Sequence, residues 1–147
     1  MGLQEIVQQT LTGAIREQDE IKRNAVRLLL TAMKNKEKEL RRQLTEEEIT
    51  QAISSQIKQR RESVEQYLQA SRPDLADPEE KEIRVLQSFL PEPLADAELE
   101  QLIAGVISET GAQSAKDMGM VMKAIMPLVS GRADGKRVSE LVRQKLR

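Results

Sequence analysis

Hydrophobic residues recur along most of the chain at intervals of three and four positions. This spacing places them on one face of an α-helix. The pattern predicts seven helices. The first four cover residues 3–18, 20–42, 45–68 and 79–89, and apolar residues at 99–107, 118–129 and 138–146 mark the last three. The predicted core face of the second helix consists of Ile21, Ala25, Leu28, Leu29, Ala32 and Met33, and that of the third consists of Ile49, Ala52, Ile53, Ile57, Val64 and Leu68. No stretch alternates between apolar and polar residues as a strand does, so the sequence predicts an all-α protein.

Several residues mark the ends of these helices. Thr45 precedes Glu48 by three positions, which is the spacing of a capping box at a helix start. Gly111 follows the fifth helix as glycine does after many helix ends. The two prolines of "SRPDLADPEE" predict a break between the third and fourth helices.

The segment "LPEPLADAELE" is the predicted domain boundary. It has two prolines in three positions, and Asp96 can cap the helix that follows. We therefore predict a helical N-terminal domain over residues 1–92 and a small three-helix tail domain over residues 93–147.

The segment "GRADGKR", residues 131–137, has the glycines and basic residues of a phosphate-binding loop. A Walker loop has four residues between its glycines, then lysine and a hydroxyl residue, and it follows a strand. Only three residues separate Gly131 from Gly135, Arg137 occupies the hydroxyl position, and a predicted helix precedes. We therefore interpret the segment as a turn, in which Gly131 is the left-handed cap of the sixth helix and Asp134 the N-cap of the seventh.

Charge is distributed unevenly in the second half of the chain. Residues 110–147 contain eight bases and three acids, whereas residues 91–109 contain five acids and no base. The whole chain has a net charge of -1, which argues against general binding to nucleic acid or membrane. Two interpretations of the basic region stay open, a patch that meets a phosphate backbone and a set of faces whose charges compensate.

The composition excludes several kinds of site. The chain has no histidine and no cysteine, so it has no disulfide, no thiolate nucleophile and no histidine-based hydrolase triad. Tyr67 and Phe89 are the only aromatic residues, which argues against a platform for stacking single-stranded bases. The acidic run at residues 46–48 complements the dipole at a helix start and needs no ion. We expect no catalytic residues, no metal and no cofactor.

The sequence also predicts a location. No apolar run reaches the roughly 20 residues of a membrane span, and the start "MGLQEIVQQT" lacks a signal peptide. We expect a soluble cytoplasmic protein without a membrane partner, and the sequence indicates no oligomeric state.

The stretch "SAKDMGMVMKAIMPLVSGRADGKRVSELVRQKL" resembles the tail of the GatB/YqeY family. Stand-alone YqeY-like proteins share this tail with the B subunit of the glutamine-dependent amidotransferase that acts on misacylated Glu-tRNA or Asp-tRNA. Upstream, "VRLLLTAMKNKEKEL", "LTEEEI", "IKQRRESVEQY" and "LPEPLADAEL" resemble the N-terminal half of YqeY proteins. The resemblance covers nearly the whole chain, and residues 116–119 and 131–136 are its most specific parts.

The resemblance implies a helical tail that helps to hold tRNA. It also implies an association with carbon–nitrogen ligase activity, in which glutamine is the amide donor, although the catalytic parts of the amidotransferase lie outside the shared segment. For the stand-alone members it implies no settled cellular role. The candidate phosphate contacts are basic residues of the tail: Lys116, Lys123, Arg132, Lys136 and Arg137.

Two glycines and one methionine of the tail are further candidates. Gly119 lies inside the sixth helix, where glycine costs about 1 kcal/mol relative to alanine. We expect Gly119, and with it Gly131, to permit a close approach by another backbone, either of this chain or of RNA. Met118 and Met122 share the core-facing side of the helix, whereas Met120 lies on the other side and is the candidate for contact with a protein partner.

Arg60 falls on the apolar stripe of the third helix, where a charge needs a partner. It could form an internal ion pair or reach the rim of the core with its charged end. Alternatively, nearby bases could form a ridge that meets RNA: Lys34, Lys36, Lys38, Arg41, Arg42, Lys58 and Arg61. Glutamates among these bases favour opposite-charge pairs on solvated helix faces.

Three functions follow as hypotheses. The first is a non-catalytic module that binds tRNA or another structured RNA. The second is an adaptor that binds a protein through the apolar surface around Met120. The third and weakest is an amidotransferase activity of the chain itself.

Overall fold

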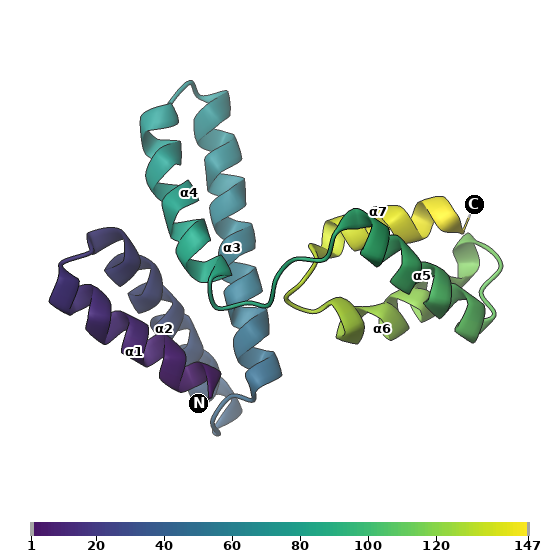
Figure 1. The fold of residues 1–147 in the computed structure, drawn as a ribbon, viewed down its shortest axis with the longest axis horizontal. Helices are drawn as coiled ribbons and strands as arrows, with labels where there is room; N and C mark the ends of the chain where they lie inside the picture. The colour runs from purple at the N-terminus through teal and green to yellow at the C-terminus, as the bar shows by residue number, and fades with distance from the viewer. Residues whose placement is uncertain (1, 147) are drawn as a thin grey trace. The chain divides into compact units, whose positions relative to one another are not determined.

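The computed structural model describes residues 2–146, and within them it contains seven α-helices, one short 3-10 helix and no strand (Figure 1). The prediction of an all-α protein is confirmed. The chain divides into two compact units, one ending at Leu90 and the other beginning at Pro91. Each unit has a buried apolar cluster of its own.

The first unit consists of two helical hairpins. One pairs α1 (Leu3–Glu17) with α2 (Glu20–Leu40), and the other pairs α3 (Glu46–Gln69) with α4 (Pro73–Gln87) (Figure 1). Their apolar cluster consists of Val7, Val26, Leu29, Met33, Leu44, Ile49, Ile53, Ile57, Ile83 and Leu86. On α3 these residues lie in its first half, so the apolar core ends before the tip of the α3–α4 hairpin.

The second unit consists of α5 (Asp96–Thr110), the 3-10 helix η1 (Ala115–Asp117), α6 (Met118–Val129) and α7 (Gly135–Lys145). Its core consists of Leu99, Ile103, Val106, Val121, Ile125, Val129, Val138, Leu141, Val142 and Leu146. All three α-helices contribute to this core, so each of them presents its opposite side to solvent.

Two helix ends follow the local sequence signals. The backbone N–H of Glu48 donates to the Thr45 hydroxyl over 3.2 Å, and the N–H of Thr45 donates to the Glu48 carboxylate over 3.0 Å. This reciprocal pair is the predicted capping box. Gly111 ends α5 in the left-handed conformation, with φ at 71°. Both local predictions are confirmed.

Two other helix starts differ from their prediction. The fourth helix begins at Pro73 rather than at residue 79, because a proline at the first helical position lacks only an N–H that would be unpaired anyway. Pro78 then lies inside the helix. The N-cap of α5 is Ala95, and Asp96 is the first helical residue and makes no cap hydrogen bond.

The predicted apolar stripes are also only partly buried. Leu28 on α2 is 52% exposed, and Leu68 near the end of α3 is 53% exposed, although both fall on predicted core faces. Val26, which lies outside the predicted stripe of α2, is fully buried. The spacing of apolar residues along a helix determines which residues share a face, but the packing of neighbouring helices decides which part of that face is covered.

Candidate nucleic-acid interface

The segment between α6 and α7 is a turn that joins two helices. Gly131 has a φ of 76°, in the left-handed region that glycine adopts without strain. The carboxylate of Asp134 accepts a hydrogen bond of 3.3 Å from the backbone N–H of Lys136, and α7 begins at Gly135. The segment is therefore the predicted helix-to-helix turn, with Asp134 as the N-cap of α7. The prediction that Gly131 caps α6 is wrong, because the C-cap is Ser130 with a non-helical backbone (φ -54°, ψ 125°) and Gly131 follows it inside the turn.

Arg132 attaches the segment before α5 to this turn. Its carbonyl oxygen accepts a hydrogen bond of 2.8 Å from the backbone N–H of Leu94. Its Nε donates to the carbonyl oxygen of Glu92 over 3.1 Å. This candidate phosphate contact is therefore already engaged, through both its backbone and its side chain.

Arg137 makes a second connection of the same kind. Its Nη2 lies 3.2 Å from the carboxylate of Asp96, and its Nη1 lies 3.9 Å from that of Glu140. We call the contacts of Arg132 and Arg137 with residues 92–96 the linker clasp. Exposed ion pairs such as these contribute about 1 kcal/mol or less, so the clasp positions the linker more than it stabilises the fold.

The other three candidate bases are exposed and make no ion pair within residues 2–146. Lys116 lies in η1, Lys123 lies midway along α6, and Lys136 lies in the first turn of α7. The twelve residues of α6 span about 18 Å, and Lys116 and Arg132 flank opposite ends of this helix. The five bases are therefore distributed along α6 and the turn and do not form one cluster.

The surroundings of Gly119 are open. A Cβ atom placed on this glycine would meet no atom within 4 Å. The expectation that another backbone of this chain approaches Gly119 is therefore wrong for the part of the chain that the structure describes. The alternative, an approach by RNA, stays a prediction.

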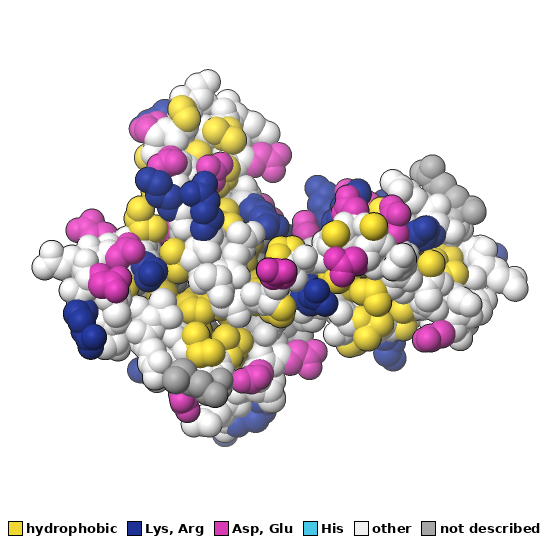
Figure 2. Space-filling model, viewed as in Figure 1, with side chains coloured by type: hydrophobic (Ala, Val, Ile, Leu, Met, Phe, Trp, Pro, Cys, Tyr) yellow, Lys and Arg dark blue, Asp and Glu magenta, His cyan; other side chains and the backbone are white. Residues whose placement is uncertain are grey.

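Exposed apolar side chains lie on α6. Met120 is 46% exposed, Met126 is 38% exposed and Leu128 is 53% exposed. Met118 and Met122 instead pack against the core of the unit. Figure 2 shows hydrophobic side chains gathered on the face of this unit along which α6 runs.

In the first unit, Arg60 forms an internal ion pair. It is only 6% exposed, and its Nη1 contacts the carboxylates of Glu79, at 3.2 Å, and Glu82. Its Nε and Nη2 are buried without a hydrogen-bond partner. Burial raises the pKa of the Glu82 carboxyl, as does the nearby charge of Glu79, whereas Arg60 opposes this shift. The interpretation of Arg60 as an internal ion pair is confirmed.

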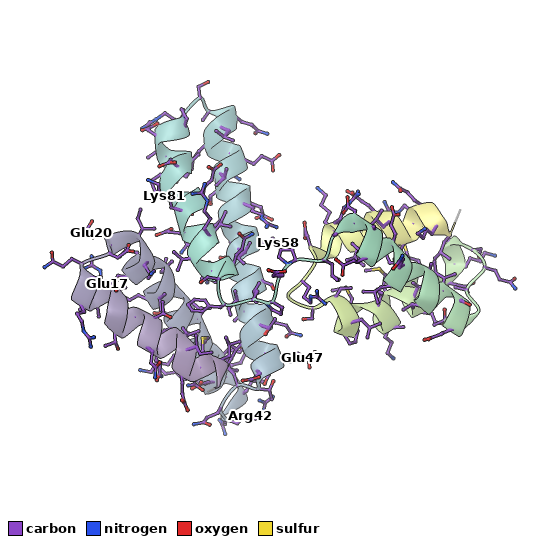
Figure 3. The ribbon with its side chains drawn as sticks, in the orientation of Figure 1. Glu17, Glu20, Arg42, Glu47, Lys58 and Lys81 are labelled. Atoms are coloured by element: carbon purple, nitrogen blue, oxygen red, sulfur yellow. The ribbon has the colours of Figure 1, made fainter. Side chains whose placement is uncertain are left out.

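The possible basic ridge of the first unit is interrupted by such pairs. Arg42 binds both carboxylate oxygens of Glu48, at 2.6 and 3.1 Å, and Lys36 lies 3.6 Å from Glu39. The Arg42 guanidinium, together with the Thr45 backbone, lowers the pKa of Glu48 to about 2. Figure 3 shows Lys58 midway along α3, far from Arg42, which lies before the start of that helix. These bases therefore do not form a continuous ridge.

The acidic residues 46–48 serve local structure. Glu46 accepts a hydrogen bond of 3.1 Å from the backbone N–H of Leu3, at the start of α1, and Glu48 completes the capping box of α3. In the part of the chain that the structure covers, no three acidic residues converge in a way that could hold a metal ion.

The fold and surface define a two-unit helical protein whose smaller unit presents lysines and apolar side chains to solvent. It matches the Yqey-like protein family over residues 4–146, and it belongs to that family. The resemblance seen in the sequence is thereby confirmed.

Several relatives of the chain have the name "Altered inheritance of mitochondria protein 41, mitochondrial". The protein from Lachancea thermotolerans is 31% identical over 102 residues, which are 67% of this chain and 54% of that protein. The one from Pyrenophora tritici-repentis is 28% identical over 143 residues, which are 94% of this chain and 77% of that protein. This chain thus spans about half the length of the first relative.

The names of these relatives bear on location. They are named as mitochondrial proteins, so the cytoplasmic location expected from the sequence is not established. Within residues 2–146, no helix is long and apolar enough to cross a membrane.

Proposed function

We propose that the chain is a non-catalytic helical module that binds tRNA or another structured RNA through its second unit. The observation that supports this most is a set of exposed lysines in η1, α6 and the first turn of α7 that form no ion pair within residues 2–146: Lys116, Lys123 and Lys136. Side chains of this kind can neutralise phosphates without first breaking an internal ion pair. The resemblance of this unit to the tail that helps to hold tRNA in the amidotransferase points the same way.

The binding is electrostatic, so salt should weaken it strongly. If three lysines each neutralise one phosphate, a rise in salt from about 50 to 200 mM should weaken binding by roughly 20- to 40-fold, from the counterion slope of about 0.7–0.9 per phosphate. The test is a titration of the intact chain with fluorescently labelled, unfractionated tRNA at several salt concentrations. Absence of binding at the lowest salt, or an affinity that salt does not change, would refute the proposal.

Gly119 offers a separate test of the same surface. The substitution Gly119→Ala adds a methyl group where the chain itself leaves open space, so it should not disturb the fold. If an RNA backbone approaches α6 closely at this point, the variant should bind tRNA several-fold more weakly while the helix becomes more stable. A variant that binds as tightly as the wild type would remove Gly119 from the interface.

A second function, an adaptor that binds another protein, is favoured by the exposed apolar residues Met120, Met126 and Leu128. Methionine side chains adapt to irregular surfaces, which suits a protein contact. Retention of a protein partner in high salt by the wild type, and its loss in Met120→Glu, would favour the adaptor over the RNA-binding module.

The carbon–nitrogen ligase activity is the weakest alternative, and formation of an amide from glutamine by the purified chain would support it. The cytoplasmic location also remains part of the proposal, and fractionation of cells that express the tagged chain would test it.

A further inference from the structure

The outer side of α7 carries two basic residues that are aligned with each other. Lys136 and Arg143 are seven positions apart, which places them about 20° apart around the helix and about 10 Å apart along it. Both are exposed, and neither forms an ion pair within residues 2–146. They lie away from Val138 and Val142, which α7 buries in the core.

The only acidic residue of α7 does not neutralise this pair. Over residues 135–145 the helix contains four bases and one acid, Glu140. Glu140 is four positions after Lys136, a spacing at which an ion pair can form. Its carboxylate instead lies 3.9 Å from Arg137. The charges of Lys136 and Arg143 are therefore available to a partner outside the chain.

The stability of the helix does not explain why Lys136 is basic. The first turn of α7 contains Lys136 and Arg137 and no acid, whereas α1 to α5 each have an acid there. A positive charge at a helix start opposes the helix dipole. A residue that works against local stability without an evident gain is more often found at functional sites. Arg143 lies in the last turn, where the helix dipole favours a positive charge, so of these two residues only Lys136 opposes the dipole.

We propose that Lys136 and Arg143 form a two-point contact with the sugar–phosphate backbone of RNA, along the outer side of α7. This inference rests on the proposed RNA-binding function. It adds Arg143 to the contact residues, and it orients the RNA backbone along the outer side of α7. The guanidinium can bind two oxygens of one phosphate, while the lysine acts as a point charge. Arg132 and Arg137 are assigned to the linker clasp, where they hold residues 92–96 in place.

The test compares two double variants of the intact chain that remove equal charge. One is Lys136→Gln/Arg143→Gln. Its matched control is Arg16→Gln/Arg27→Gln on α1 and α2, where both arginines are also exposed and form no ion pair within residues 2–146. Labelled, unfractionated tRNA is the probe, and far-UV circular dichroism checks that both variants keep the wild-type helix content.

We expect the α7 variant to bind at least tenfold more weakly near 150 mM salt. The slope of log affinity against log salt concentration should also become smaller by about 1.4–1.8, because two phosphate contacts are removed. The control should stay within about twofold of the wild type. Arg143→Lys in an otherwise wild-type chain should keep the salt slope, because it keeps the charge, but it should bind several-fold more weakly, because lysine cannot bind two oxygens of one phosphate.

The possible failures are distinguishable. If the wild type binds tRNA and the α7 variant binds equally well, the two-point contact is wrong and the proposed function stands. An equal loss in both double variants would mean that overall charge, rather than this helix, determines the affinity, and it also overturns the contact. If the wild type does not bind tRNA, the proposed function fails and this inference fails with it.

Discussion

The buried arginine of the first unit permits a sharp prediction about stability. The side chain of Arg60 is 8% exposed, and its carboxylate partners Glu79 and Glu82 are 25% and 13% exposed. Arg60→Met keeps most of the buried volume but removes the positive charge between the two carboxylates. Breaking a buried ion pair by removing one partner typically costs about 3–5 kcal/mol.

Two features of the structure reduce this cost. Both carboxylates retain some contact with water, so part of their charge can be hydrated. The substitution also removes two buried nitrogens of Arg60 whose N–H groups have no acceptor, and buried donors without an acceptor destabilise the folded state. We therefore expect Arg60→Met to destabilise the first unit by about 2 kcal/mol, which is a decrease of about 1 M in the urea midpoint for an m-value of about 2 kcal/mol per molar.

The chain provides a signal that is specific to the first unit. Tyr67 on α3 is the only tyrosine, and the chain has no tryptophan, so tyrosine emission follows the unfolding of this unit alone. Far-UV circular dichroism follows both units together. The neighbouring exposed residue gives a matched control, since Arg61→Met should change stability by no more than about 0.5 kcal/mol.

A second substitution tests the cause. The double variant Arg60→Met/Glu82→Met also removes one of the two carboxylates that lose their positive partner, so at least half of the lost stability should return. If the double variant is as unstable as Arg60→Met, the loss arises from packing and not from unpaired charge. A midpoint for Arg60→Met that equals that of Arg61→Met would show that the ion pair contributes nothing.

Further predictions concern pH and backbone conformation. Burial raises the folded-state pKa of Glu82 above its unfolded value. The stability of the wild type relative to Glu82→Gln should therefore be greatest at acid pH and decrease as the pH rises through the folded pKa. Urea midpoints of both proteins from about pH 4 to 7 test the direction of this change. Glu48 should behave in the opposite way, because its pKa falls to about 2. The advantage of the wild type over Glu48→Gln should be complete at neutral pH and disappear as the pH falls towards 2, and equal midpoints at pH 7 would contradict this. Gly131→Ala should destabilise the second unit by about 1–2 kcal/mol because its φ is 76°, whereas Gly119→Ala should stabilise it by about 1 kcal/mol; thermal unfolding followed by circular dichroism compares the two.

Much of the fold could be predicted from the sequence because its signals act over one or two helical turns. The capping box of Thr45 and Glu48 involves residues three positions apart, and the turn after α6 needs only Gly131 and Asp134. Such interactions form within a short segment, whatever the rest of the chain does. Proline is a less certain signal, because Pro73 could end one helix or begin the next, and the structure shows that it begins α4.

The candidate site could be predicted only in part. The five tail bases were visible as charges, but the sequence gives no sign that Arg132 and Arg137 contact residues 92–96, about 40 positions earlier. The spacing of Lys136 and Arg143 was visible, yet its meaning depends on which side of α7 is covered. The burial of Val138 and Val142 in the core shows which side of α7 is covered.

The sequence by itself determined the helices, most of their ends and the need of Arg60 for a partner, because each depends on residues close together in the chain. Only the tertiary structure decided that Glu79 and Glu82 are this partner, that Leu28 stays exposed and that the linker clasp forms. The physical reason is that burial and ion pairing between distant residues require the helices to pack first. A periodic pattern specifies the faces of a helix, but not the neighbour that covers them.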